Sequence, residues 1–429
     1  MSLWPLAIGV GSAAVAAGAL VVPTARRLAF GTVAFDWLGH ELEVDRVEPD
    51  RITVRMKSGS VARVWSLGGL AYDTRPEAEQ AALLQGRADF VAACAARGVT
   101  LRLFGVKRRQ GIDAAATWPS PALAEIGAAE AACFRSAFRL RWFVSLHAAA
   151  LHQLEEADEQ VAALLAAYRP SRLTRPADPE GDCPLAGFVN GLLSGDFRED
   201  VAACSANLSA ALPAADLVVT ADGRIVAPVP LPLTHRVVAV RAWPETLSGH
   251  LLHELTALAG EVEVNQVVVP IGRDRAAMLV KRGARSTWGA AQARAEFAAA
   301  EELLAQGRTA LLATQTSLVL RAADEAGLDA LTQQVMRILA DRRVVASVET
   351  RAAVPVWFNR LPDHDRLVRP LKLFAENVAA LWPFESAPVG MPASAYGVGA
   401  VRTFLTGSGQ AYQFQFQASQ APKALGAFV

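Results

Sequence analysis

The chain has 429 residues, 52% hydrophobic and 20% charged, a composition that excludes an intrinsically disordered protein. Its 42 basic and 42 acidic residues give a formal net charge of +0. This balance argues against an overall electrostatic attraction to nucleic acid, although a local basic patch stays possible. At about 150 residues per domain, the length predicts roughly three domains. The four cysteines have no CxxC spacing, which indicates neither a zinc cluster nor a disulfide framework and fits a reducing compartment.

The N-terminal segment is uncharged from residue 3 to residue 22, and as a helix it would be about 30 Å long, the thickness of a bilayer core. Pro23, Arg26 and Arg27 follow it, whereas a secretory signal carries its positive charge before the apolar run. We expect a transmembrane anchor at the bacterial inner membrane, with the bulk of the chain on the cytoplasmic side. The alternative is a buried helix rich in alanine and glycine.

An N-terminal α/β subdomain is expected over residues 31–120, after an anchor at residues 1–30. Alternating apolar and polar residues predict short strands at 42–44, 52–56 and 61–65. A helix with proline near its first turn follows at 75–96, and a strand at 99–106.

A helical middle region is expected over residues 121–232. It contains a strand at 138–146, an amphipathic helix at 151–168, two short helices at 185–193 and 201–211, and a hairpin at 218–226. An alanine-rich linker with Pro119 and Pro121 precedes it.

A second α/β subdomain is expected over residues 233–385. Strands are predicted at 236–242, 262–269, 318–322 and 344–349, and helices at 246–258, 285–306 and 328–339. This alternation is typical of ferredoxin-like α/β plaits. Residues 386–429 complete the chain with a β-hairpin.

Nucleotide-binding motifs are absent from the sequence. No segment reads GxxxxGK[ST], and the nearest glycine-rich stretch, residues 405–410, lacks the lysine and leads into an alternating strand, so we expect a hairpin turn. Residues 397–399 lack the third glycine of a dinucleotide-binding loop.

Other candidate sites have ordinary structural explanations. His250 and His253 share one helical face but have no third metal ligand at a recognisable spacing, and we expect solvated histidines. Residues 363–365 (Asp-His-Asp) are interpreted as turn residues, and residues 107–109 (Lys-Arg-Arg) as a solvated strand end. No GxSxG elbow occurs. We therefore name no catalytic, cofactor-binding or metal-binding residue.

The C-terminal third contains a more specific series of short motifs. They are Phe-Asn-Arg-Leu-Pro at 358–362, Arg-Pro at 369–370, Glu-Asn-Val-Ala-Ala-Leu-Trp-Pro-Phe at 376–384, Val-Arg-Thr-Phe-Leu-Thr at 401–406, and Ser-Gly-Gln-Ala-Tyr-Gln-Phe-Gln-Phe at 408–416. This series resembles the stretch before the Walker A motif in the type IV secretion and conjugation ATPases of the CagE/TrbE/VirB family. The family's Leu-Pro-Gly-Asn turn is Leu-Pro-Asp-His here, and its Gly-x-Pro-Tyr-x-Phe-x-Phe strand is matched loosely. Weaker similarity at 67–73 and 237–269 extends the resemblance to roughly residues 47–429.

The apolar N-terminal segment and the strand–helix pattern predict an α+β fold: an N-terminal transmembrane helix followed by ferredoxin-like α/β plait subdomains. The resemblance implies that the RecA-like motor domain is lacking. Residues 422–429 would approach the P-loop strand, so the chain is expected to be truncated before the Walker A motif. ATP and magnesium are then expected only for that C-terminal domain, and this chain should not hydrolyse ATP alone.

The function implied by the resemblance is the N-terminal membrane-docking and assembly region of a type IV secretion ATPase that powers conjugative or effector transfer. The implied partners are inner-membrane secretion components, membrane lipid and further copies of the chain, a hexamer in the family, with no direct nucleic-acid contact. A stand-alone membrane-anchored scaffold or regulator without a motor is the alternative. A cryptic hydrolase built from scattered histidines and aspartates is a third hypothesis.

Overall fold

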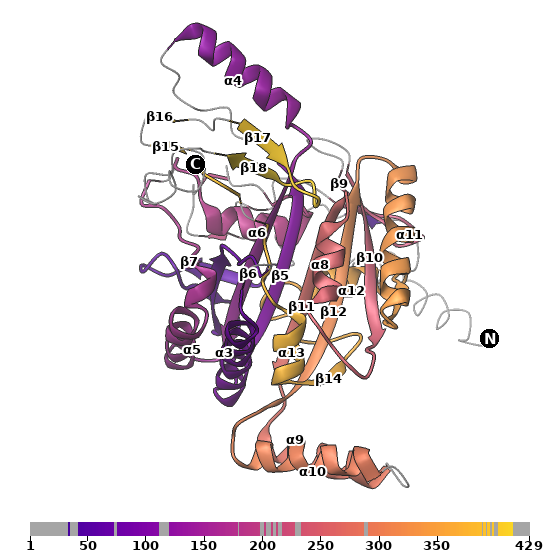
Figure 1. Ribbon diagram of the computed structural model, residues 1–429. Coiled ribbons are helices and arrows are strands. Elements are labelled where there is room, and N and C mark those ends of the chain that lie inside the picture. Colours follow the sequence, from indigo (N-terminus) through magenta and orange to yellow (C-terminus); the bar gives the residue numbers. More distant parts are fainter. Residues whose placement is uncertain are drawn as a thin grey trace, which may run out of the picture.

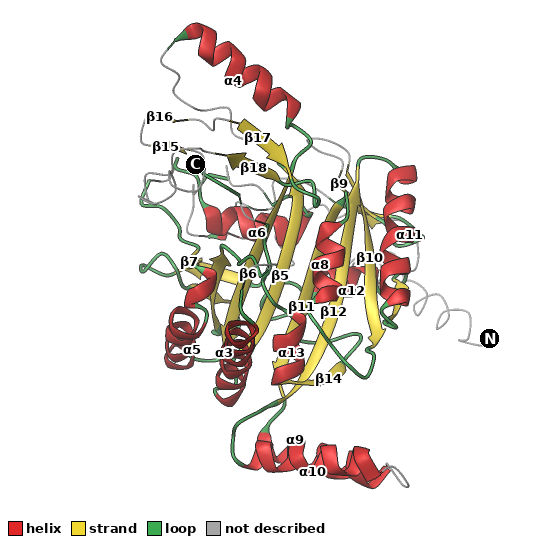
Figure 2. Ribbon diagram, in the orientation of Figure 1, coloured by secondary structure: helices red, strands yellow, loops and turns green. Residues whose placement is uncertain are grey.

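The computed structural model describes residues 33–34, 42–72, 75–110, 120–178, 180–197, 201–202, 207–208, 212, 217–227, 233–286, 291–387, 389–391, 393–394, 397–398 and 402–414. A large antiparallel sheet runs through the molecule, with helices on both of its faces (Figures 1 and 2). Its strand order is β1-β8-β9-β10-β12-β11-β5-β6-β4-β3-β2, with β13 beside β10, β14 beside β12 and β7 beside β4.

The first half of the sheet is a βαββαβ unit. Its elements are β4 (Val61–Leu67), α3 (Glu77–Ala96), β5 (Thr100–Arg109), β6 (Phe138–Ala148), α5 (Leu151–Leu164) and β7 (Pro170–Arg172). The strands pair in the order β5-β6-β4-β7, and every pairing is antiparallel. This connection and this order define a ferredoxin-like unit. Two short strands, β2 (Val44–Val47) and β3 (Val54–Met56), extend the sheet beyond β4.

The second half of the sheet repeats the same path. Its elements are β10 (Leu233–Ala242), α8 (His250–Ala257), β11 (Glu261–Pro270), β12 (Leu311–Ala322), α11 (Glu325–Asp341) and β13 (Val345–Val348). The strands pair in the order β11-β12-β10-β13. The two units join where β5 pairs with β11, from Val106 opposite Glu263 to Leu101 opposite Val268. Strands β1 (Val33–Ala34), β8 (Val218–Val219) and β9 (Ile225–Ala227) complete this side of the sheet.

Both faces of the sheet are buried, each in its own hydrophobic core. Successive side chains along a strand point to opposite faces, so they enter the two cores in turn. Leu103 and Val238 face a core shared with α3, α5, α8, α11 and α13 (Ala375–Leu381). Phe104 and Val237, their neighbours in sequence, face a second core with α6 (Pro184–Ser194) and α12 (Ala353–Phe358). The central strands are therefore apolar on both faces, which explains why they are visible in the sequence as apolar runs.

Local sequence signals define helix α11 well. Asp324 caps its start, since the carboxylate oxygen Oδ1 accepts a hydrogen bond from the Gly327 N–H at 2.7 Å. Its buried residues recur three or four positions apart, which places them on one helical face: Leu328, Leu331, Thr332, Val335 and Leu339.

Each unit carries a helical insertion between its second and third strands. Helix α4 (Pro121–Cys133) lies between β5 and β6, and helices α9 (Arg273–Ser286) and α10 (Ala291–Ala305) lie between β11 and β12. Because β5 and β11 are antiparallel neighbours, the two insertions project from opposite ends of the sheet (Figure 1). The sequence predicted one long helix at 285–306, which missed α9. It predicted an alanine-rich linker containing Pro119 and Pro121 and no helix after it, so α4 was missed.

The C-terminal part returns to the main sheet and its core, where α13 is buried. Strand β14 (Leu371–Phe374) pairs with β12. Two small separate hairpins follow, one formed by β15 (Ala393–Ser394) with β16 (Gly397–Val398), the other by β17 (Arg402–Leu405) with β18 (Ala411–Phe414). The expected hairpin turn at 405–410 is present between β17 and β18.

The predicted fold class was wrong in its N-terminal transmembrane helix. Across the described residues, no helix has both the length and the apolar composition that crossing a bilayer requires. The proposed anchor at residues 3–22 itself lies outside the described residues. Strands from both expected plait subdomains also lie in one continuous sheet, so the fold is α+β with a large antiparallel sheet.

Candidate functional site

The Asn359-Arg360-Leu361-Pro362 motif lies at the end of α12 and organises the chain that follows it. The Asn359 side-chain amide donates to the carbonyl oxygens of His364 at 2.8 Å and Arg366 at 3.0 Å. Its own oxygen accepts a hydrogen bond from Gln315 on β12 at 3.0 Å. Asn359 and Gln315 are both buried, so they supply partners for loop backbone that would otherwise lie unpaired in the interior. This part of the motif therefore has a structural role.

Arg360 occupies the centre of a buried charged cluster. Its guanidinium donates to Glu263 Oε1 at 2.7 Å and to the Leu192 carbonyl at 2.7 Å, and it lies 3.9 Å from the centroid of the Trp357 ring. Arg108 donates to the other oxygen of Glu263 at 3.1 Å. One carboxylate thus joins two arginines from α12 and β5 to β11 at the junction of the two units. A buried charge requires such pairing because its desolvation costs several kcal/mol.

Lys107 and Arg108 were predicted to end a strand in solvent, and this prediction was wrong. The Lys107 ammonium is buried and donates to the carbonyl oxygens of Thr256 at 2.7 Å, Leu258 at 2.6 Å and Ser408 at 2.6 Å. Burial lowers the pKa of Lys107 to about 8. Lys107 ties the end of α8 to the β17–β18 turn, so two of the three basic residues in this cluster are structural.

Asp363 and Asp365, interpreted from the sequence as turn residues, also bind His147 on β6. His147 Nε2 lies 2.8 Å from Asp363 Oδ1, and Nδ1 lies 3.6 Å from Asp365 Oδ2. Ser60 and Ser58 donate to Asp363 at 2.9 and 2.6 Å. Burial alone would lower the pKa of His147, but hydrogen bonds to the two carboxylates raise it above 6.5.

The same contacts argue against a serine hydrolase at this cluster. Ser60 Oγ lies 2.9 Å from His147 Nε2, the distance expected for a nucleophile and its base. Asp363 Oδ1 lies 2.8 Å from the same nitrogen, and Ser60 Oγ donates to that carboxylate, so the serine proton is directed to Asp363 and not to the imidazole. The geometry therefore supports a clamp that holds the 363–365 loop on the sheet.

The clamp gives a pH-dependent stability that can be checked. Hydrogen bonds from His147, Ser58 and Ser60 overcome the effect of burial and lower the pKa of Asp363 from 3.8 to about 2. The Asp363 contribution is thus complete above 3.8 and lost as the pH falls through about 2. The His147 contribution is complete below 6.5 and lost as the pH rises through the raised folded pKa.

We therefore expect His147→Gln to lower the free energy of unfolding more at about pH 5 than at about pH 9. Urea unfolding of both proteins at the two pH values measures this difference. An equal loss at both values would contradict the protonated clamp.

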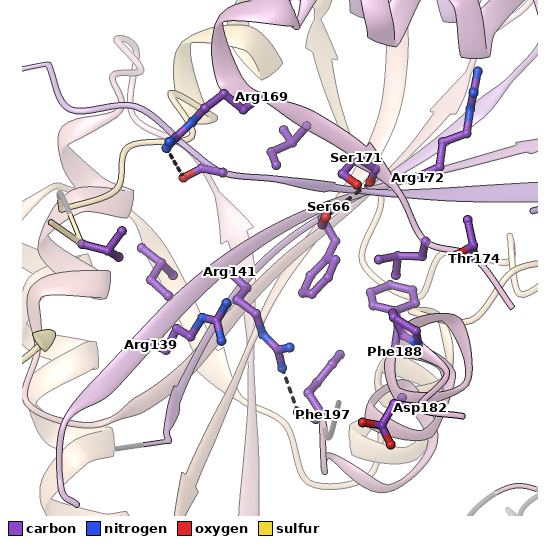
Figure 3. A pocket seen from close by; sticks show the side chains of 18 residues that line it. Ser66, Arg139, Arg141, Arg169, Ser171, Arg172, Thr174, Asp182, Phe188 and Phe197 are labelled. Carbon is purple, nitrogen blue, oxygen red and sulfur yellow. Dashed lines mark hydrogen bonds between the residues drawn. The ribbon is translucent and has the colours of Figure 1, made fainter. Parts of the chain in front are cut away.

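A pocket of about 790 Å³ opens between β6, β7 and α6, and Figure 3 shows the side chains that line it. Arg139 and Arg141 are two residues apart on β6 and lie on the same face of the strand as Phe143. Among the described residues, the lining carries four arginines and one carboxylate: Arg139, Arg141, Arg169, Arg172 and Asp182.

Main-chain carbonyls position two of these arginines. Arg141 Nη2 donates to the Phe197 carbonyl at 2.7 Å, as the dashed line in Figure 3 marks. Arg169 Nη2 donates to the Gly68 and Gly69 carbonyls at 3.2 and 3.3 Å. The backbone of Arg169 is held at φ 53, a left-handed conformation that is uncommon for a residue other than glycine.

The aromatic wall of the pocket comes from α6 and the segment after it. The Phe143 and Phe188 ring centroids are 4.9 Å apart, and Phe197 completes the group at 6.0 Å from Phe188. The pocket thus brings guanidinium groups and aromatic rings together, and the Arg141 guanidinium lies 5.6 Å from the Phe143 ring centroid.

Comparison with known protein families identifies the region that contains the motif. Residues 184–369 match the model of the CagE, TrbE, VirB family, a component of the type IV transporter system. The match, which covers less than half of the chain, supports membership in this family. The matched region starts at the first residue of α6 and ends at Arg369, so it includes the second βαββαβ unit, α9, α10 and the buried Arg360–Glu263 pair. No curated protein matches the chain.

The other residues singled out from the sequence lie apart from the pocket. His250 and His253 are on α8, where His253 Nδ1 lies 3.1 Å from Glu385. In the part of the chain that the structure describes, no group of three or more His, Cys, Asp or Glu residues could hold a metal ion.

The pocket was not predicted from the sequence. The alternation of Arg139 and Arg141 on a predicted strand is the one available signal, since it places both side chains on one face. Arg169 and Arg172 follow the helical segment and approach the pocket only through the pairing of β7 with β4, which the sequence does not reveal.

Proposed function

We propose that the chain is the docking and assembly region of a type IV secretion ATPase, and that its α9–α10 hairpin binds partner proteins of the machine. Membership in the CagE/TrbE/VirB family supports a role among type IV secretion components. The proposal places this assembly at the cytoplasmic face of the bacterial inner membrane, with the contact made through partner proteins.

The observation that carries the proposal is the exposed outer face of α9. Arg275, Met278 and Arg282 follow each other three and four positions apart, so they lie on one helical face. Met278 is 61% exposed although it is apolar. A methionine between arginines on a projecting helix suits an amphipathic partner surface that carries acidic groups.

The opposite face of α9 holds the hairpin together. Ala276 and Val280 are buried against Leu304 of α10 and Leu311 at the start of β12. Lys281 on α9 pairs with Glu301 on α10 at 3.3 Å. Packing therefore uses one side of α9 and leaves the Met278 side facing solvent.

Photo-crosslinking from the outer face of α9 tests the proposal. Replacing Met278 by a benzoyl-phenylalanine in cells that produce the secretion system should give an adduct with another type IV component, identified by mass spectrometry. Leu84 on α3, which is 38% exposed, is the matched control position and should give no such adduct. Adducts that are absent from position 278, or that are the same from both positions, would refute docking by the hairpin.

A further inference from the structure

We propose that the outer edge of β13 binds an extended, acidic segment of a partner protein as an added β-strand. Among the residues that the structure describes, β13 (Val345–Val348) pairs with β10 alone, so no strand covers its other edge. It lies on the β10–α11 side of the sheet (Figure 1). Unpaired backbone N–H and C=O groups at a sheet edge form a template for a further strand. Neither the family match nor the docking role of the α9–α10 hairpin assigns a partner to this edge.

The register of β13 on β10 determines which backbone groups face outward. The Glu349 N–H, one residue past the strand, donates to the Val237 carbonyl at 2.8 Å. Hydrogen-bonded pairs alternate with non-bonded pairs along an antiparallel ladder, so Ser347 also directs its backbone groups toward β10. Ala346 and Val348 then direct their N–H and C=O groups outward. Each of these two residues offers one donor and one acceptor to an added strand.

The side chains at this edge are apolar and exposed. Val345 is 57% exposed and Val348 is 37% exposed, whereas Val238 of the neighbouring strand is fully buried. Val345 and Val348 are three positions apart, so they point to opposite faces of the sheet. The side chains of an added strand also alternate between the two faces, so each face offers them a valine to pack against.

The exposed charges that flank β13 are mostly positive. Within four positions of the strand, the exposed charged residues are Asp341, Arg342, Arg343 and Arg351. Glu254 already pairs with Arg342. The carboxylate directly after the strand, Glu349, is buried and accepts a hydrogen bond from Arg369 at 3.1 Å. A segment with carboxylates beside its apolar positions therefore complements this edge better than a basic segment does.

Self-pairing of two β13 edges is disfavoured by the same charges. In the antiparallel register that uses both outward residues, Ala346 of one copy is opposite Val348 of the other. Arg343 and Arg351 are each four residues from the centre of this register, so they come together across the pair. Like charges at opposed positions destabilise a strand pair. The acidic segment is therefore expected to belong to a different chain.

Three synthetic peptides separate the parts of this proposal when their affinity for the full chain is measured by fluorescence anisotropy. Labelled Glu-Glu-Thr-Val-Thr-Val-Glu-Glu should bind at one site per chain. The same peptide N-methylated at its four central residues, and a version with lysines in place of the glutamates, should each bind at least about tenfold more weakly. Equal affinity of the N-methylated peptide would overturn strand addition, and equal affinity of the lysine peptide would overturn the acidic preference. Absence of saturable binding would overturn the site.

Variants assign this binding to β13. Ala346→Pro removes an outward N–H and leaves the hydrogen bonds to β10 in place, so the chain should fold and bind the acidic peptide at least about tenfold more weakly. Arg343→Glu should weaken binding to a similar extent because it reverses a flanking charge. Arg97→Glu makes the same change at the end of α3, where Arg97 pairs with Glu156, and should bind as the wild type does. Wild-type affinity in Ala346→Pro, or equal weakening by both arginine variants, would contradict the proposal.

Hydrogen exchange on the wild-type chain gives an answer that does not depend on the folding of any variant. Excess acidic peptide should slow exchange of the amides in residues 345–348 and leave those of β2, at the far end of the sheet, unchanged. Unchanged exchange at 345–348 would overturn the proposal. Sedimentation of the chain without peptide tests self-pairing. A dimer that Ala346→Pro dissociates would show that β13 binds a second copy, and this result would also overturn the proposal.

Discussion

Replacing Glu263 by glutamine is expected to lower the free energy of unfolding by about 3–5 kcal/mol, because it leaves two buried arginines without their counter-charge. Glu263 is fully buried on β11 and accepts from Arg360 at 2.7 Å and from Arg108 at 3.1 Å. The glutamine keeps the size of the side chain, so the loss reports on charge and hydrogen bonding and not on a cavity. Urea unfolding at neutral pH, followed by circular dichroism, measures the change.

Glu254→Gln is the matched control for this prediction. Glu254 pairs with Arg342 on the surface, where both side chains are more than a third exposed and the interaction is screened by water. This variant should unfold almost as the wild type does. Comparable midpoints for Glu263→Gln and Glu254→Gln would show that the buried cluster contributes no net stability.

The position of Glu263 explains why its effect should spread through the molecule. It lies on β11, which pairs with β5 of the first unit and with β12 of the second. Arg108 and Arg360 then connect the same carboxylate to β5 and to the end of α12. We therefore expect the Glu263→Gln variant to unfold in a single transition, because both units share this junction.

Most of the sheet could be predicted from the sequence because its strands are buried on both faces. The strand predicted at 262–269 agrees closely with β11, and the strand at 138–146 with β6. Helix α11 was equally visible through its repeat of buried leucines. The pairing of β5 with β11 could not be predicted, since nothing local specifies which distant strand fills a sheet edge.

The two helical insertions, α4 and α9–α10, were poorly predicted from the sequence. Helix α9 contains many charged residues, and its apolar positions Ala276 and Val280 belong to a small cluster with α10, the start of β12 and Phe374. Helix α4 is alanine-rich and has only Ala131 buried, so no apolar face marks it. Segments with few packing partners give weak periodic signals, and both insertions were missed or misplaced for this reason.

The charged residues were the least predictable part of the chain. Lys107 and Arg108 were predicted to end a strand in solvent, but the end of α8 and the β17–β18 turn cover Lys107. Glu263 and the Phe197 ring cover Arg108. Asp363 read as a turn residue, which its φ of 63 bears out, while its contact with His147 joins segments far apart in the sequence. The sequence shows which charged residues are present but not the distant partners that give them a role.

Replacing the α9–α10 hairpin by a short Gly-Ser turn should leave the sheet folded and abolish binding to type IV partners. The two chain segments from which the hairpin projects are already adjacent, because the Ile271 N–H donates a hydrogen bond to the Leu311 carbonyl at 3.2 Å. Removing residues 273–308 therefore keeps β11 and β12 in register and takes away only the small core around Val280. The thermal midpoint should fall by only a few degrees.

A point variant tests whether partner binding depends on the outer face of α9 and not only on the presence of the hairpin. Met278→Glu keeps both helices and places a negative charge between Arg275 and Arg282, so partner binding should weaken without a change in the fold. Leu84→Glu on α3 introduces the same charge at an exposed apolar position elsewhere and should bind as the wild type does.

The most direct test of the docking function is the amount of type IV secretion component that co-purifies with each form of the chain from cells producing the machine. Docking through the hairpin predicts that the hairpin replacement recovers at least about tenfold less partner than the wild type, with Met278→Glu also reduced and Leu84→Glu unchanged. Recovery of the same partners in wild-type amounts by the folded hairpin replacement would contradict the account.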